Sequence, residues 1–152
     1  MNIRQRLSDL GLSIPVAAKP VAAYVPATQT GNLIFTAGQL PLVDGKMVAT
    51  GKVGAEVSVD DAKKLAEVCA LNCLAAIETL LPIERIHRIV RVVGYVNGAS
   101  GFTSQPAVIN GASELFVNLW GEAGKHARSA IGVAELPLDA PVEVELTVEI
   151  QN

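Results

Sequence analysis

Histidine and the common catalytic motifs are nearly absent from this sequence. It holds only two histidines, His87 and His126, which leaves little material for a Ser-His-Asp triad or a metal hydrolase site. It has no glycine-rich phosphate loop followed by Lys and Ser or Thr, no dinucleotide-binding fingerprint, no HExxH and no GxSxG. We therefore expect neither a cofactor nor a bound metal.

Cysteine is equally scarce. Cys69 and Cys73 are the two cysteines of the chain, and a spacing of four residues on a helix places both thiols on one face. A metal site needs further ligands nearby, and both histidines lie far along the chain. Free cysteine is among the most buried residue types, so we interpret the pair as two small buried hydrophobes.

Long apolar runs and an excess of positive charge are missing too. The longest apolar-rich stretch, residues 65–81, is interrupted by Glu67, Asn72 and Glu78, and a bilayer span needs roughly 18 continuous apolar residues. The N-terminus has no apolar core of signal-peptide length. A net charge of −3 gives no electrostatic reason to bind a nucleic-acid backbone. We expect a cytoplasmic protein without a membrane partner, and a nucleic-acid partner is disfavoured.

The residues that are abundant favour helices packed on a sheet. Half of the 152 residues are hydrophobic, but only 4% are aromatic, so the apolar mass is mostly Ala, Val, Leu and Ile. β-Branched residues fill strands, and alanine lets helices approach a sheet closely. The chain length fits a single domain with one core.

Hydrophobic periodicity and turn residues predict the elements of that domain. Ser58 is a candidate N-cap for the longest helix, and the dense apolar strand 88–96 belongs in the sheet interior. We expect helices over 2–10, 58–81 and 106–120, a hairpin of strands 24–27 and 32–37 around a turn at residues 30–31, and strands over 47–50, 88–96, 130–134 and 142–150. The result is an α/β (α+β) fold, a mixed sheet with two long helices on one face. Its other face needs cover, which other subunits of a closed homo-oligomer would supply.

Arg128 and Glu143 are the candidate catalytic residues. Arg128 precedes an apolar strand, where a guanidinium can clamp a carboxylate with two parallel hydrogen bonds. Glu143 alternates with the core-facing Val142 and Val144, so it points to the opposite face. In a partly dry cleft its pKa would rise, and it could act as general base or acid on a water. Spacing alone also allows a solvated strand face for Glu143 and a surface ion pair for Arg128.

An ordered set of motifs resembles the RidA family, also called YjgF or L-PSP endoribonuclease-like. The segment around Arg128, a following Leu-Pro at 136–137 and the Val-Glu-Val-Glu run at 142–145 are similar to the family's characteristic C-terminal segment. The resemblance covers roughly residues 20 to 150 and extends to residues 23–25, the strand 32–41 with its Gly38-Gln39 pair, Asn72 and Asn110.

This resemblance implies a chorismate-mutase-like fold assembled as a homotrimer, with a cleft at each subunit interface. In well-studied members the clefts hydrolyse reactive enamines and imines, such as 2-aminoacrylate, to a keto acid and ammonia. By position, Arg128 would bind the carboxylate of a small-molecule substrate and Glu143 would position or activate water. The pocket would be lined by Tyr24, Gly38, Asn110 and Ala130.

Several positions depart from the family pattern. His126 stands where members often have Pro, and Ala130 stands where many have Cys or Ser. Residues 1–19 form an N-terminal extension with a short helix, ahead of a RidA-like domain over 20–152, and glycine-rich additions occur near 97–101 and 121–124. The sequence therefore resembles a long-chain branch of the family with a reshaped pocket.

Three functions remain open. The first is hydrolytic deamination of enamine and imine intermediates. The second is a metabolite-binding protein in which Arg128 holds a small carboxylate without turnover. The third is an endoribonuclease, which would require His87 and His126 to converge as acid and base. Loss of activity in Glu143→Gln with ligand binding retained would favour catalysis over binding alone.

Overall fold

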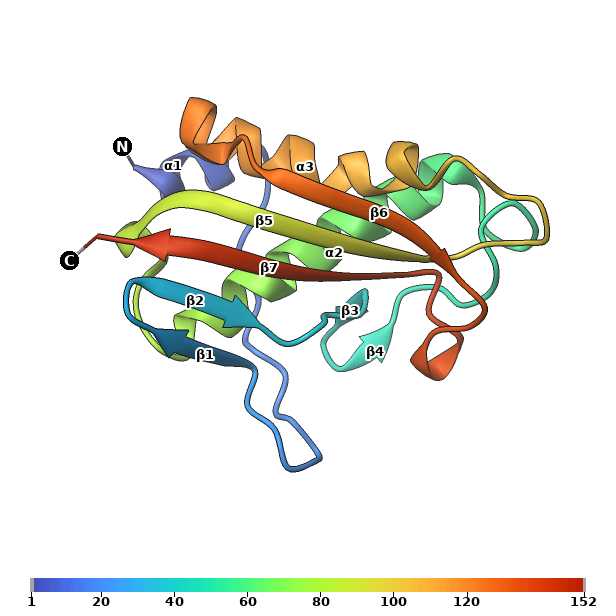
Figure 1. Cartoon of the computed structure of the whole chain (residues 1–152), viewed down its shortest axis with the longest axis horizontal. Helices are drawn as coiled ribbons and strands as arrows, with labels where there is room; N and C mark the ends of the chain where they lie inside the picture. The colour runs from blue at the N-terminus through green and yellow to red at the C-terminus, as the bar shows by residue number, and fades with distance from the viewer. Residues whose placement is uncertain (1, 152) are drawn as a thin grey trace.

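A five-stranded sheet forms the centre of the computed structural model, which describes residues 2–151 (Figure 1). The strands lie in the order β1-β2-β7-β5-β6, and each neighbouring pair is antiparallel except β5 and β6. They are β1 (Ala27–Thr30), β2 (Leu33–Thr36), β5 (Ile86–Asn97), β6 (Ala127–Val133) and β7 (Val142–Ile150). Two further strands, β3 (Leu42–Val43) and β4 (Lys46–Met47), pair separately with each other.

Two long helices cover one face of this sheet, and in Figure 1 both lie behind it. They are α2 (Val59–Glu78) and α3 (Gln105–Trp120), and they pack on each other as well as on the strands. Three single turns complete the structure, η1 (Ile83–Arg85), η2 (Gly121–Gly124) and η3 (Pro137–Asp139). The predicted fold class, a mixed sheet with two long helices on one face, is confirmed.

The helix α2 begins where its sequence predicts, directly after Ser58. Ser58 Oγ accepts a hydrogen bond of 3.1 Å from the backbone N–H of Asp61, as an N-cap does, and Asp60 and Asp61 lie in the first turn. The helix ends at Glu78, three residues before the predicted Leu81. Pro82 disfavours helical geometry in the residue before it, so the chain leaves the helix through a short turn.

The core lies between the helices and the sheet. In β7 each second residue is buried, from Val142 to Ile150, and β5 lies between β7 and β6 as its dense apolar sequence predicts. Gly111 of α3 lies directly against α2, because a Cβ at this position would come within 1.8 Å of the Lys63 carbonyl oxygen. Only a glycine permits this approach, which fixes how α3 sits on α2.

Both buried cysteines belong to this core. The thiol of Cys69 donates to the Val142 carbonyl at 3.7 Å, and that of Cys73 to the Val144 carbonyl at 3.3 Å. Burial raises the pKa of both thiols, that of Cys73 to about 12. The interpretation of the pair as buried hydrophobes is confirmed, and no cluster of three or more metal-ligating side chains occurs within residues 2–151.

Three predicted strands differ from the structure by three residues at one end or at both ends. The hairpin joins Ala27–Thr30 to Leu33–Thr36, so the strand predicted at 24–27 begins where it was expected to end. Polar Thr28, Gln29 and Thr30 suit an exposed edge strand and hide it from apolar periodicity. The strand predicted at 47–50 is the two-residue β4.

The last corrected strand is β6. It starts at Ala127 rather than Ala130, because its backbone pairs in parallel with β5 from Arg91 onward. The parallel pair is made possible by α3, which carries the chain back along the sheet between β5 and β6. Arg128 therefore lies within a strand and not before one.

The short N-terminal helix α1 (Ile3–Asp9) is also observed. It buries Ile3 and Leu7 in the common core, and Arg6 Nη1 donates to the Leu119 carbonyl at 2.9 Å. Arg4 forms ion pairs with Glu78 and Glu84. Among the described residues, none of the helices is both long and apolar enough to cross a bilayer.

Candidate functional site

Arg128 and Glu143 lie on opposite faces of the sheet. Arg128 is level with Val92 of β5, whose buried side chain faces the helices. Glu143 is level with Tyr95 of β5, three residues further on and therefore on the other face, which no helix covers. In one chain the two residues are also separated by the width of β5, roughly 10 Å across the sheet.

Two side chains of α3 hydrogen-bond to the guanidinium of Arg128. Its Nη1 donates to Asn110 Oδ1 at 2.8 Å and to Ser113 Oγ at 3.2 Å. These bonds use both Nη1 hydrogens and leave Nε and Nη2, which together form the edge that binds a carboxylate in parallel. Ala130 follows two residues later on the same face and packs partly against the core. The predicted residues Arg128, Asn110 and Ala130 are thus brought together.

His126 joins the same cluster. Its Nε2 lies 2.9 Å from Ser113 Oγ, and its Nδ1 lies 2.7 Å from the Gly124 carbonyl oxygen. The ring also packs edge-on against Phe116. We call Asn110, Ser113, His126 and Arg128 the arginine cluster.

Glu143 belongs to a separate group on the open face. Its carboxylate lies against Gly38, where a Cβ would come within 2.2 Å of Oε1. Tyr24, Gly38 and Glu143 line a hollow of about 330 Å³, together with residues of the segment 18–21 and the exposed Leu138. We call this the Glu143 hollow. The three remaining predicted residues are therefore also brought together, on the face away from the arginine cluster.

Backbone and amide hydrogen bonds hold Gly38 in place. The backbone N–H of Gln39 donates to the Val144 carbonyl at 2.8 Å, and the N–H of Val144 donates to the Gln39 carbonyl at 3.0 Å. These hydrogen bonds hold the segment that follows β2 against β7. The side-chain amide of Asn72 donates to the carbonyls of Leu40 and Leu42, each at 3.0 Å. Asn72, which belongs to the set of family-like residues, thus supports the loop and does not enter the hollow.

The environment of Glu143 favours proton transfer. Its side chain is half-buried, because Gly38 and the segment before β1 lie over this end of β7. Burial raises the pKa of Glu143 above its ordinary value, and the negative charge of Glu145, two residues along the same face, raises it further. A carboxylate with a raised pKa is a better base toward water.

The two histidines do not converge in one chain. His126 is turned toward α3 and hydrogen-bonded there, whereas His87 is exposed near the start of β5. Arg91 is level with Ala127, so His126 is level with about Val90, and His87 lies about three residues, or roughly 10 Å, further along the sheet.

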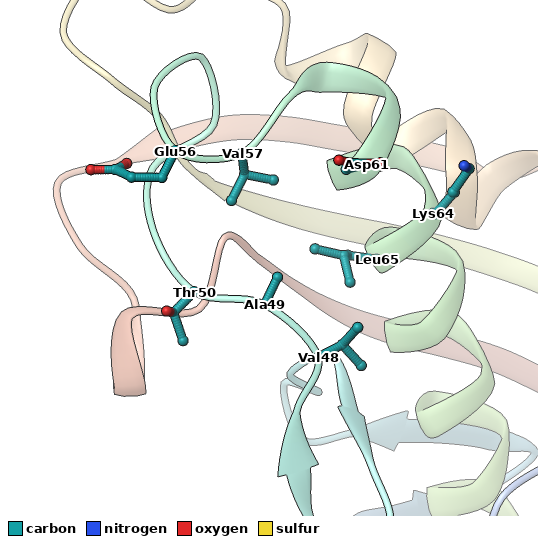
Figure 2. A pocket seen from close by; sticks show the side chains of 8 residues that line it. All are labelled: Val48, Ala49, Thr50, Glu56, Val57, Asp61, Lys64 and Leu65. Atoms are coloured by element: carbon teal, nitrogen blue, oxygen red, sulfur yellow. The ribbon is translucent and has the colours of Figure 1, made fainter.

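A second hollow lies at the start of α2 and holds none of the predicted residues. It has a volume of about 280 Å³ (Figure 2). Apolar side chains from the segment after β4 and from α2 form its walls, and charged groups stand at its rim. It is lined by Val48, Ala49, Thr50, Glu56, Val57, Asp61, Lys64 and Leu65.

Sequence reasoning missed Ser113. It lies three residues after Asn110 on α3, so both side chains share one face of the helix and reach the same guanidinium. That spacing was a usable signal. Sequence reasoning also missed Leu138, which lines the Glu143 hollow. Its φ of 56° is uncommon for leucine, so the sequence does not indicate the turn in which it lies.

The comparisons with known proteins agree with this architecture. Residues 4–150 match the family described as "YjgF/chorismate_mutase-like, putative endoribonuclease". The chain is 38% identical to protein TCP17 of Trypanosoma cruzi, over 99% of this chain and 96% of that protein. It is 31% identical to the 2-iminobutanoate/2-iminopropanoate deaminase of Escherichia coli, over 85% of this chain and 88% of that enzyme. A solved structure of a protein of unknown function from Agrobacterium tumefaciens superposes with a TM-score of 0.92 at 44% identity, covering 98% of this chain and 92% of that one.

Proposed function

The chain belongs to the YjgF/chorismate mutase-like family, and from that premise we propose that it hydrolyses reactive enamines and imines of the 2-aminoacrylate type to a 2-keto acid and ammonia. The observation that carries the proposal is the half-buried Glu143 carboxylate, which faces a hollow across a glycine and has a raised pKa. Relatives named as imine deaminases, at 29% and 31% identity, support the same chemistry.

The reaction asks little of the protein. 2-Aminoacrylate becomes an iminium ion when its terminal carbon takes up a proton. Water then adds to the electrophilic iminium carbon, and Glu143 accepts the proton that the water loses, which leaves a neutral carbinolamine. Glu143 next returns this proton to the nitrogen, the C–N bond breaks as the C=O bond forms, and the hydroxyl proton leaves with the ammonia as ammonium, beside the keto acid. Orientation and one base suffice, because the imine carbon is already electrophilic.

Arg128 supplies the orientation in this proposal. Its Nε and Nη2 edge binds the substrate carboxylate, and Asn110 holds the guanidinium from the other side. Since Arg128 and Glu143 lie on opposite faces of one sheet, we place each site between two subunits of a homotrimer. The arginine cluster of one subunit then meets the Glu143 hollow of the next, which brings Tyr24, Gly38 and Ala130 to the same cleft.

The test is keto-acid release from 2-aminoacrylate generated in situ by a dehydratase. We expect wild type to accelerate release, and Arg128→Ala and Glu143→Gln to lower the rate about 100- to 10,000-fold, the usual contribution of a general base or a substrate clamp. Glu149→Gln and Arg88→Ala are matched controls. Glu149 points to the same face of β7 but is hydrogen-bonded to Asn32 at 2.9 Å, and Arg88 is exposed.

Three outcomes would contradict the proposal or its residue roles. A folded, oligomeric wild type that does not accelerate release from several amino-acid-derived imines rules out the deaminase. Pyruvate binding that Glu143→Gln retains, without turnover in wild type, leaves the carboxylate-binding protein as the function. Equal losses in the control variants would remove Arg128 and Glu143 from their assigned roles.

A further inference from the structure

A serine, a histidine and an arginine share one chain of hydrogen bonds on the helix-covered side of β6. Ser113 Oγ stands between His126 Nε2, at 2.9 Å, and Arg128 Nη1, at 3.2 Å. His126 Nδ1 in turn lies 2.7 Å from the Gly124 carbonyl oxygen. The function proposed above uses Arg128 and Asn110 but gives Ser113 and His126 no role.

The partners of each atom determine which group donates. A carbonyl oxygen only accepts, so His126 Nδ1 carries a hydrogen and donates it to Gly124. A neutral imidazole then has its lone pair at Nε2, which accepts the hydrogen of the Ser113 hydroxyl. Ser113 therefore turns its own lone pairs toward Arg128, whose Nη1 donates to them.

The surroundings of the ring favour its neutral form. Burial lowers the pKa of His126 most, the hydrogen bond to Gly124 opposes this, and the positive charge of Arg128 lowers the pKa again. Among the described residues, the other groups that hydrogen-bond to the ring or stack on it are uncharged. They are the Ser113 hydroxyl and the Phe116 ring from α3, and the Gly124 carbonyl from η2. Neutral His126 is the form in which the Ser113 hydroxyl donates to Nε2.

We propose that His126, acting through the Ser113 hydroxyl, is a positioning residue for Arg128 and makes carboxylate binding at Arg128 depend on the charge of His126. The inference rests on the proposed function in one respect, the assignment of a carboxylate to Arg128. Ser113 and Asn110 take both Nη1 hydrogens, and the planar guanidinium is thereby fixed with Nε and Nη2 directed away from α3.

The dependence on charge follows from one shared oxygen. Protonated His126 would place a second positive charge one hydroxyl away from Arg128. A bound carboxylate offsets this repulsion, so it raises the pKa of His126, and protonation must tighten carboxylate binding by the same factor. The affinity for a carboxylate is therefore expected to rise as the pH falls toward the pKa of His126 in the free protein, which burial holds below its ordinary value.

Calorimetric titration of the full chain with pyruvate, between about pH 5 and pH 8, tests the positioning. We expect Ser113→Ala to weaken binding about tenfold at neutral pH, the effect of one hydrogen bond to a charged group, and Ser113→Thr to restore it. His126→Gln keeps an acceptor for the hydroxyl, so it should retain affinity at high pH and lose the rise at low pH. Ser104→Ala is the control, because this N-cap side chain makes no capping bond.

Glu143 also titrates, so the same measurements are repeated in a Glu143→Gln background. Nitrogen NMR of His126 gives a readout that a merely structural role would not move. We expect the Nδ1–H tautomer in the free protein and a higher His126 pKa after pyruvate is added. In turnover assays the loss in Ser113→Ala should appear in KM and not in kcat.

An unchanged pyruvate affinity in Ser113→Ala, an Nε2–H tautomer, or a wild type that does not bind pyruvate would each overturn the inference. The inference and the proposed function fail separately. Deamination with an unchanged KM in Ser113→Ala rejects the positioning role and leaves the deaminase intact. Pyruvate binding that depends on Ser113, without any turnover, retains the positioning role and rejects the deaminase.

Discussion

Arg128 is tied to α3 by hydrogen bonds from its own side chain, whereas Glu143 is placed by a neighbour that has no side chain at all. The guanidinium has two fixed acceptors on α3. The carboxylate lies against Gly38, near another negative charge and partly away from water. The first arrangement holds a cation still, and the second raises the proton affinity of an acid.

This difference suits two different tasks. A residue that clamps a carboxylate needs a fixed direction, because parallel hydrogen bonds tolerate little rotation. A residue that exchanges protons with water needs a pKa near the working pH and an environment that does not stabilise its charge. In the function proposed above, the two residues lie on opposite faces of one sheet, and a second copy of the chain brings the two tasks together.

Mixing two inactive variants is the strongest way to break the comparison. If the arginine cluster and the Glu143 hollow meet across a subunit boundary, trimers assembled at random from Arg128→Ala and Glu143→Gln chains regain about a quarter of wild-type activity. Each variant alone is expected to lack activity. Keto-acid release after joint refolding measures the recovery, and no recovery from well-folded mixed trimers would place both residues in one site of a single chain or in none.

The direction of the arginine can be tested without removing its charge. Arg128→Lys keeps the positive charge but cannot donate to Asn110 and also grip a carboxylate with two parallel bonds. We expect the Kd for pyruvate to rise about 10- to 100-fold, in line with the strength of bidentate charged pairs. Arg88→Lys serves as the control in the same calorimetric titration. A loss of less than threefold would show that charge alone, and not geometry, binds the carboxylate.

The glycine beside Glu143 offers a smaller change. Gly38→Ala adds a methyl where Oε1 now lies, so the flexible carboxylate must move while its chemistry stays intact. We expect kcat to fall about tenfold, with little change in stability, because a small displacement of a catalytic group is costly. The double variant Gly38→Ala with Glu143→Gln should be no slower than Glu143→Gln alone. Additive losses would mean that Gly38 acts on something other than Glu143.

The smallest expected effects are on the free energy of unfolding. Its dependence on pH has opposite directions for Glu143 in the hollow and for His126 in the arginine cluster. Glu143 has a raised pKa, so its contribution to stability is complete below about 4.5 and is lost as the pH rises through its folded value. His126 has a lowered pKa, so its contribution is complete above about 6.5 and is lost as the pH falls through its folded value. Denaturant unfolding should therefore find Glu143→Gln more stable than wild type at neutral pH. His126→Gln should lose less stability than wild type on acidification, and the reverse order in either variant would contradict the direction of the pKa shift of Glu143 or His126.

Much of the fold could be predicted because its elements carry local signals. The strict alternation over β7 and the Ser58 cap of α2 are readable without any tertiary information, and both have the predicted starting points. The start of β6 was not readable, because pairing with β5 extends the strand over polar residues. Propensity is overridden wherever a neighbouring strand supplies the hydrogen bonds.

The sequence predicted the individual residues of the candidate site. It did not predict that they would be divided between the arginine cluster and the Glu143 hollow, on opposite faces of the sheet. The resemblance identified Arg128 and Glu143 together, and alternation showed only that Glu143 leaves the core. The face of the sheet on which the Arg128 side chain lies depends on the pairing of Arg128 with Val92. A single sequence does not show how two strands are paired. The pocket assignments of all six residues remain predictions that the experiments above address.

The contact between Gly111 and Lys63 has a consequence for recognition far from any ligand. Asn110 and Ser113 lie on one face of α3, because residues three apart in a helix share a face. A rotation of α3 about its own axis would therefore move both side chains away from Arg128. The Lys63 carbonyl lies where a side chain at position 111 would otherwise be, so α3 packs closely on α2, and this contact opposes rotation of the helix. The absence of a side chain at Gly111 therefore helps to fix the orientation of α3 and, through Asn110 and Ser113, the direction of the Arg128 guanidinium on β6.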